Sequence, residues 1–342
     1  MKRESSKRHV VIPVFVPHKG CPFDCIYCNQ KLISGQINEM SIEKMREIIE
    51  RILSTAGENM IEIGFYGGSF TGIEKEQQLR FLEAANVYIN EGRVESIRLS
   101  TRPDYINREI LDYLWKYNVR TIELGVQSLD EKVLELSLRG HTTDDVLKAS
   151  ALVKEYGFSL GIQTMTGLPG SSPETETATA EKVAGLKPDI VRIYPTLVIK
   201  DTYLERMYRE GKFKPQSLEE AVGICSRILE IYENNGINVI RIGLQPTDTI
   251  NEDMDVIAGP FHPAFRQLVE SRLALQKMER EINSGKISEG SSIAIYTGEK
   301  NISNVTGQKK TNILYLKKKY LFEDIKVIPL KEMGNDISII LQ

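Results

Sequence analysis

The chain has 342 residues, of which 41% are apolar and 27% are charged, and its formal net charge is −3. This is the composition of an ordinary globular protein, and the charge gives no global electrostatic reason to expect nucleic-acid or membrane-surface binding. The sequence has no apolar run near the roughly 18 residues of a spanning helix and no signal-peptide cleavage site, so we expect a cytoplasmic protein with no membrane partner.

Strand and helix signals alternate through the first two-thirds of the chain. Short apolar runs predict strands at 10–16, 61–68, 97–100, 121–126, 160–166, 189–198 and 237–243. Longer amphipathic stretches predict helices at 41–57, 75–91, 107–117, 143–156, 173–185 and 217–235. Such alternation implies right-handed βαβ units and a parallel sheet. We therefore predict an α/β fold, a partial or full TIM-type (βα)6-7 barrel, whose active site lies at the carboxyl ends of the strands.

The remainder of the chain has a different pattern. Predicted helices at 262–282 and 301–320 and predicted strands at 292–298, 325–330 and 336–342 indicate a small α/β domain. The expected organisation is a flexible basic amino terminus (1–8), a barrel (9–250) and a small carboxyl-terminal α/β domain (251–342), which we expect to cap the barrel or bind substrate.

Three of the four cysteines lie within eight positions of "GCPFDCIYCNQ" (20–30), directly after the first predicted strand. In a reducing compartment, clustered cysteines indicate metal ligands before disulfides. Cys21, Cys25 and Cys28 leave a fourth ligand unassigned, which suits an open iron–sulfur site or a zinc site completed by His18. Cys225 falls on the apolar stripe of a predicted helix and is expected in the core.

The C-x₃-C-x-aromatic-C motif resembles that of the radical SAM superfamily. The resemblance implies a 4Fe–4S cluster on Cys21, Cys25 and Cys28, with S-adenosyl-L-methionine (SAM) bound to the fourth iron. It implies reductive cleavage of SAM to a 5′-deoxyadenosyl radical that abstracts hydrogen from a substrate. It also implies that Tyr27 lies beside the adenine, and that a reductant such as flavodoxin or ferredoxin supplies the electron.

Later loops resemble the SAM-binding motifs of the same superfamily. In "GFYGGSFTG" (64–72), Gly67 and Gly68 match the methionine-binding motif, and Ser69 replaces its acidic residue. The "GVQS…RGH" stretch (125–141) resembles the branch that contains coproporphyrinogen oxidase and the Elongator catalytic subunit. By this resemblance the expected SAM contacts are Tyr27, Gly67, Gly68, Ser69, Ser100, Arg102, Gln127, Arg139 and Gln163.

The segment "YPTLVIKDTYLERMYREGKFKP" (194–215) closely resembles the radical SAM barrel of the Elongator catalytic subunit, which modifies transfer RNA. The likeness extends from about residue 9 to about residue 245, although the cysteine spacing here is more compact. About 80 residues follow, and they lack the pyrophosphate loop of an acetyltransferase, so we expect no use of acetyl-CoA.

The substrate is left open as a small molecule or RNA. Residues 309–326 hold six lysines interleaved with Tyr315 and Tyr320, which suits either RNA binding or a solvated helix whose Ile313, Leu314 and Leu321 pack inward. Two alternatives to a radical SAM enzyme also remain at this point: a zinc-stabilised RNA-binding module and a scaffold that binds SAM without cleaving it.

Overall fold

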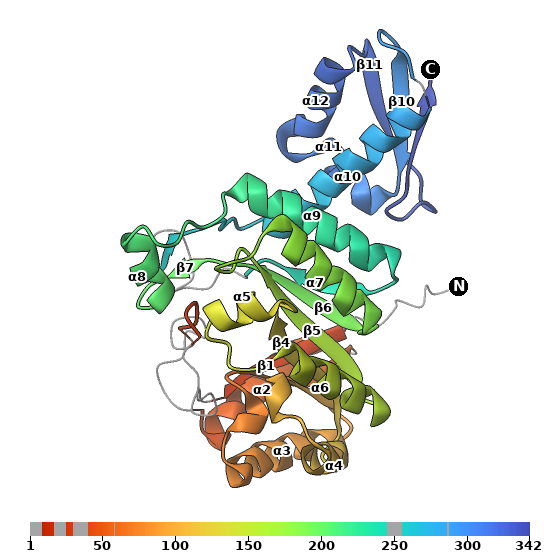
Figure 1. Ribbon diagram of the computed structural model, residues 1–342. Coiled ribbons are helices and arrows are strands. Elements are labelled where there is room, and N and C mark those ends of the chain that lie inside the picture. Colours follow the sequence, from red (N-terminus) through yellow and green to blue (C-terminus); the bar gives the residue numbers. More distant parts are fainter. Residues whose placement is uncertain (1–8, 17–24, 30–39, 58, 245–254, 286) are drawn as a thin grey trace, which may run out of the picture.

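The computed structural model describes residues 9–16, 25–29, 40–57, 59–244, 255–285 and 287–342. Its main sheet has seven parallel strands that curl into a partial barrel (Figure 1). In spatial order these are β1 (His9–Val16), β2 (Met60–Gly67), β3 (Ser96–Thr101), β4 (Val119–Gln127), β5 (Ser159–Thr166), β6 (Ile190–Pro195) and β8 (Asn238–Ile242). The predicted α/β class and incomplete barrel are thereby confirmed.

Helices between the strands cover the outer face of this sheet (Figure 1). They are α2 (Ile42–Ala56), α3 (Lys75–Asn90), α4 (Arg108–Lys116), α6 (Thr143–Glu155), α7 (Pro173–Gly185) and α9 (Leu218–Asn234). The strands place apolar side chains under the helices at alternate positions, as Val191 and Ile193 of β6 do. The intervening side chains, such as Arg192, therefore lie on the opposite side of the sheet, which we call the inner face.

Short elements shape the carboxyl-terminal rim of the barrel. They are η2 (Phe70–Gly72), η3 (Pro103–Tyr105), α5 (Glu131–Leu136), α8 (Tyr203–Arg209), β7 (Val198–Ile199) and β9 (Val256–Ala258). The single strand predicted over 189–198 was too long, because β6 ends at Pro195. The chain then leaves the main sheet, and Val198 pairs antiparallel with Ala258.

The carboxyl-terminal layer packs against the barrel through α10 (Phe265–Ser284) (Figure 1). Val269 in the first half of α10 belongs to the barrel core, whereas Met278 belongs to a second core. The other elements are β10 (Ser292–Thr297), η4 (Glu299–Asn301), α11 (Ile302–Thr306), η5 (Gln308–Lys310), α12 (Thr311–Lys319), β11 (Asp324–Pro329) and β12 (Ile337–Leu341). Among the described residues, none of the helices is long and apolar enough to cross a bilayer.

The continuous helix predicted over 301–320 was wrong. Gly307, Lys309 and Lys310 all have positive φ values, and they separate α11 from α12. The left-handed region is sterically costly for lysine, so this backbone must be held by its surroundings.

Candidate active site

Cys25 and Cys28 lie at the barrel rim in a tight turn, where the Cys28 N–H donates to the Cys25 carbonyl at 2.9 Å. The intervening Ile26 is buried against α8, and its carbonyl accepts a 2.7 Å hydrogen bond from the N–H of Leu204. On the other side, the Ile26 N–H donates to the Ser137 carbonyl at 3.3 Å, just beyond α5. Two rim elements therefore fix the position of this turn.

The predicted third ligand, Cys21, lies outside the described residues, as does the zinc alternative His18. Within the described residues, no three His, Cys, Asp or Glu side chains gather as a metal-binding group. The two described thiols still fit a thiolate-ligated iron–sulfur cluster chemically, because they share one turn and a cationic side chain contacts one of them.

That cation is Arg139, which follows α5. Its Nη1 donates to Cys25 Sγ at 3.3 Å, and its Nη2 donates to the Gly125 carbonyl at 2.6 Å. A Cβ on Gly125 would lie 2.8 Å from Nη2, so glycine gives the guanidinium room to reach the backbone. Burial raises the pKa of neighbouring Tyr27 well above its usual value, although Arg139 acts in the opposite direction. Arg139 thus joins the cysteine turn to the end of β4.

Two further predicted SAM contacts meet where β4 and β5 end. Gln163 Nε2 donates to Gln127 Oε1 at 3.2 Å. Gln127 has a φ of 68° beside a bulge in the β4–β5 pairing, an uncommon conformation for a residue other than glycine. The structure therefore brings Gln127, Gln163 and Arg139 to one part of the rim, close to Cys25.

The loop after β2 contains the predicted methionine-binding glycines. Gly67 has a φ of 106°, and a Cβ there would lie 2.9 Å from the Val16 carbonyl, so no other residue fits without movement. Ser69 is buried, shares a 2.7 Å hydrogen bond with Thr101 Oγ1 and accepts one from the Arg102 N–H at 3.1 Å. The serine that replaces the acidic residue of the motif therefore ties this loop to the end of β3.

Two expected SAM contacts on β3 and after it have protein neighbours of their own. The Arg102 guanidinium is buried, and its Nε and Nη2 donate to Asp104 at 2.9 and 3.0 Å. Ser100 pairs in register with Glu123 of β4. Arg102 thus has a structural role in the turn after β3, and direct contact of Ser69, Ser100 or Arg102 with SAM stays a prediction.

The loop between β5 and α7 is held by Glu176, a residue that the sequence reasoning missed. The Gly167 N–H and the Ser171 hydroxyl both donate to Glu176 Oε1, at 2.5 and 2.8 Å. Glu176 is only 5% exposed, and burial raises its pKa. A usable signal was an acidic residue in the first turn of α7, close to the "GLPGSS" loop.

A second group that the sequence reasoning missed lies on the inner face of the barrel. Arg98 bridges Glu62 and Glu123, and Arg192 forms an ion pair with Glu123 at 2.5 Å. The signal was present in the sequence as charged residues at alternate positions within otherwise apolar strands. Such residues are too costly to bury singly, which is why they are found as partners.

Cys225 and His141 have structural environments. The Cys225 side chain is buried in α9, 3.8 Å from Thr166 Oγ1, and burial raises its pKa to about 12, which confirms its predicted place in the core. His141 is 3% exposed and bonds the Val126 carbonyl through Nε2 at 3.2 Å. Burial, aided by Arg139 and Arg102, lowers the pKa of His141 to about 3, so the imidazole is neutral.

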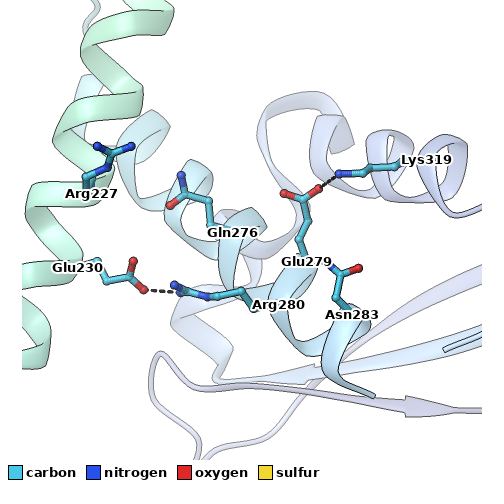
Figure 2. A pocket seen from close by; sticks show the side chains of 7 residues that line it. All are labelled: Arg227, Glu230, Gln276, Glu279, Arg280, Asn283 and Lys319. Carbon is cyan, nitrogen blue, oxygen red and sulfur yellow. Dashed lines mark hydrogen bonds and ion pairs between the residues drawn. The ribbon is translucent and has the colours of Figure 1, made fainter. Parts of the chain in front are cut away.

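The lysine-rich segment matches the solvated-helix expectation in part, because its lysines at 309, 310 and 317–319 are exposed and Ile313 packs against the second core. A pocket of about 390 Å³ lies between α9, α10 and α12. Figure 2 shows its lining side chains, among which Lys319 pairs with Glu279 at 2.5 Å and Arg280 pairs with Glu230. Leu314 and Leu321 are 61% and 59% exposed, so their expected inward packing was wrong. Leu316 and Phe322 belong to the second core instead.

Comparison with known proteins identifies two family regions. A model described as the radical SAM superfamily matches residues 15–183, and a model of the radical SAM C-terminal domain matches residues 188–274. The tRNA uridine(34) acetyltransferase of Methanocaldococcus jannaschii is 35% identical over 188 residues, which cover 49% of this chain and 35% of that protein. An uncharacterized protein of the same archaeon is 29% identical over 221 residues, covering 64% of this chain and 65% of that protein.

A solved structure of Methanocaldococcus infernus Elp3 with an amino-terminal deletion is also similar. It superposes with a TM-score of 0.62 at 26% identity, over 83% of this chain and 64% of that one. The chain spans 35% of the length of the two archaeal acetyltransferases that it matches, and 58% of the one from Dehalococcoides mccartyi. The shared part is their radical SAM region.

Proposed function

This chain belongs to the radical SAM superfamily, in its Elp3-like branch, and we propose that it binds a 4Fe–4S cluster and SAM to abstract hydrogen from a substrate. The supporting observation is the convergence of Cys25 with Arg139, Gln127 and Gln163 at the rim of the barrel. In this proposal Cys21, Cys25 and Cys28 are the cluster ligands. When bound, the reduced cluster supplies the electron for cleaving SAM to a 5′-deoxyadenosyl radical.

The protein's contribution is to hold and orient the cofactor. The backbone at Gly67 and Gly68 offers close approach for the methionine end of SAM. Arg139 and Gln127 supply donors for a carboxylate or a ribose, and Gln163 lies next to Gln127 for ribose contact. Glu176 holds the loop from Gly167 to Ser171, where backbone would approach the adenine.

The proposed substrate is a transfer RNA. Support comes from the relatives, which include proteins named tRNA uridine(34) acetyltransferase and, in Saccharomyces cerevisiae, Elongator complex protein 3. Because the similarity covers the radical SAM region of these proteins, acetyl transfer is not part of the proposal. A small acidic electron carrier of the flavodoxin or ferredoxin kind is the proposed reductant.

Anaerobic reconstitution tests the cluster assignment. The wild-type protein should take up about four irons per chain with matching sulfide. Cys25→Ala and Cys28→Ala should lose the cluster, and Cys225→Ala should retain it because Cys225 lies in the core of α9. Uptake of a single zinc without sulfide would instead support the zinc-module alternative.

Reductive SAM cleavage distinguishes the enzyme from the scaffold alternative. A scaffold would bind SAM with the cluster in place but release no 5′-deoxyadenosine when reduced. Loss of RNA binding on removing iron would add support for the proposed substrate site, whereas RNA affinity that does not depend on iron would favour a binding module.

A further inference from the structure

The inner face of the barrel holds a connected set of charged side chains, contributed by strands β1, β2, β3, β4 and β6. Glu62 Oε2 contacts Arg98 Nη2 at 2.5 Å and His9 Nε2 at 2.6 Å, and its Oε1 accepts a hydrogen bond from Ser96 at 2.7 Å. Arg98 Nη1 reaches Glu123 Oε1 at 3.4 Å. All polar atoms of Glu62 and Arg98 are therefore occupied within the protein.

Arg192 of β6 joins this set through Glu123, but its hydrogen-bonding capacity is only partly used among the described residues. Its Nε donates to Glu123 Oε2 at 2.5 Å, and its Nη2 contacts Glu123 Oε1 at 3.2 Å and the Tyr66 hydroxyl at 3.3 Å. Its Nη1 has no hydrogen-bond partner among the described residues and is not sealed from solvent. The side chain is 15% exposed, and its Nε and Nη2 are hydrogen-bonded while its Nη1 is accessible.

The strand register places Arg192 beside the proposed cofactor site. Arg192 pairs with Gln163, one of the expected SAM contacts, on the adjacent strand β5. Tyr66, which touches Arg192, directly precedes Gly67 of the expected methionine-binding loop. A group bound at Arg192 Nη1 would therefore lie next to SAM rather than in its place.

The charges of the inner face favour an anion there. On the other side of Arg192, the register partner on β8 is Arg241, whose neighbour Ile242 is buried under the helices. Arg98 and Arg192 are paired with the carboxylates of Glu62 and Glu123, and Arg241 brings a further guanidinium to the same side of the sheet. A guanidinium fixed by a carboxylate loses little conformational entropy when it binds a further anionic oxygen.

We propose that Arg192 is an anion-binding residue that receives a carboxylate or phosphate of the substrate, with Glu123 and Tyr66 holding its guanidinium in place. The proposal rests on the proposed function and adds to it the class of group that positions the substrate beside SAM. Arg192 would thereby orient the substrate by binding an end remote from the hydrogen that is removed.

The test measures binding of two probes, inorganic phosphate and acetate, to the cluster-loaded protein by ³¹P and ¹³C NMR titration at constant ionic strength. Stronger binding of phosphate would indicate a nucleotide or RNA source, and stronger binding of acetate a carboxylate source. Glu123→Gln keeps an amide oxygen that can accept from Arg192 Nε but removes the competing negative charge, so binding of the preferred probe should tighten about tenfold. Adding Arg192→Gln in the Glu123→Gln background should reverse this gain and abolish measurable binding.

The double variant is used because Arg192→Gln alone would leave the buried Glu123 carboxylate with one counter-ion fewer. Replacing both residues by glutamine removes one positive and one negative charge together, so the net charge of the site is unchanged. Arg120→Gln is the matched control, because Arg120 also lies on the barrel sheet but contacts Asn118 and backbone carbonyls, and its probe affinity should equal that of the wild type. Thermal unfolding checks that every variant is folded.

Affinity for SAM, measured on the same samples, separates this proposal from the proposed function. Failure of the wild type to bind SAM would count against the proposed function, whatever the anion result. Equal probe affinity of the wild type and a folded double variant would overturn the anion site. A fall in SAM affinity in the double variant would also overturn it, because Arg192 would then hold SAM itself.

Discussion

Arg139 and Cys25 are in direct contact across 114 residues of sequence, with Arg139 Nη1 3.3 Å from Cys25 Sγ. The same guanidinium donates to the Gly125 carbonyl at 2.6 Å, so one side chain spans the cysteine turn and β4. This relationship joins the proposed cluster site to the proposed SAM site without passing through any other side chain.

Arg139→Lys should weaken SAM binding about tenfold or more. A lysine carries the charge, but its single ammonium group cannot reproduce the two divergent donors of the guanidinium. The measurement is the dissociation constant for SAM on reconstituted protein. Arg108→Lys serves as the control because Arg108 pairs with Glu155 on the surface. Equal SAM affinity in the two variants would contradict a role for Arg139.

Ser69→Ala should lower the free energy of unfolding by about 1–3 kcal/mol, because the buried Arg102 N–H loses its acceptor. Chemical denaturation measures the effect. Ser54→Ala removes a hydroxyl from the exposed face of α2 and should change stability by less than about 0.5 kcal/mol. If Ser69→Ala were as stable as this control, Ser69 would not be what ties the two loops together.

Glu176→Gln and Glu176→Ala should behave differently. Glutamine keeps an acceptor for the Gly167 N–H and removes a carboxylate whose pKa is raised by burial, so stability at pH 7 should match or exceed that of the wild type. Alanine removes the acceptor and should cost about 1–3 kcal/mol. It should also weaken SAM binding if the loop approaches the adenine. Equal unfolding free energies for the two variants would argue against this function of Glu176.

His141 should make stability fall as the pH drops below 6.5. Its pKa is lowered to about 3 in the folded protein, so between pH 6.5 and 3 the unfolded chain binds a proton that the folded one does not. The contribution of His141 to the free energy of unfolding is complete above pH 6.5. It decreases by up to about 1.4 kcal/mol for each pH unit below that value. Denaturation of the wild type and His141→Gln from pH 7.5 to 5 measures the difference. If the unfolding free energies of the wild type and His141→Gln changed equally with pH, His141 would not have the lowered pKa that its burial implies.

Most of the barrel could be predicted because its signals are local. The apolar runs of β2, β4 and β5 and the amphipathic stripes of α2 and α9 are set by side-chain periodicity, and strand–helix alternation then restricts the topology. β7 and β9 have two and three residues and were missed, since their pairing depends on contacts far apart in sequence. The break at Gly307–Lys310 was missed because two lysines adopt a backbone conformation that their residue type does not signal.

Many residues of the candidate site could be predicted from motifs, but their contacts could not, because most of those contacts join residues far apart in the sequence. A motif names residue types but not their neighbours, so the sequence did not reveal that Arg102 is held by Asp104 or that Ser69 bonds to Thr101. Glu123 and Arg192 belong to no recognised motif, and their relationship appears only when β4, β5 and β6 are laid side by side. The cysteine assignment still rests on spacing at Cys21, which lies outside the described residues.

Reductant-dependent release of 5′-deoxyadenosine from SAM by the reconstituted protein is the decisive measurement of the proposed radical SAM activity. We expect the wild type and Cys225→Ala to release it under anaerobic conditions, whereas Cys25→Ala and Cys28→Ala should not. A wild-type protein that carries about four irons, binds SAM and releases no 5′-deoxyadenosine on reduction would show that the chain is not a radical SAM enzyme of this kind.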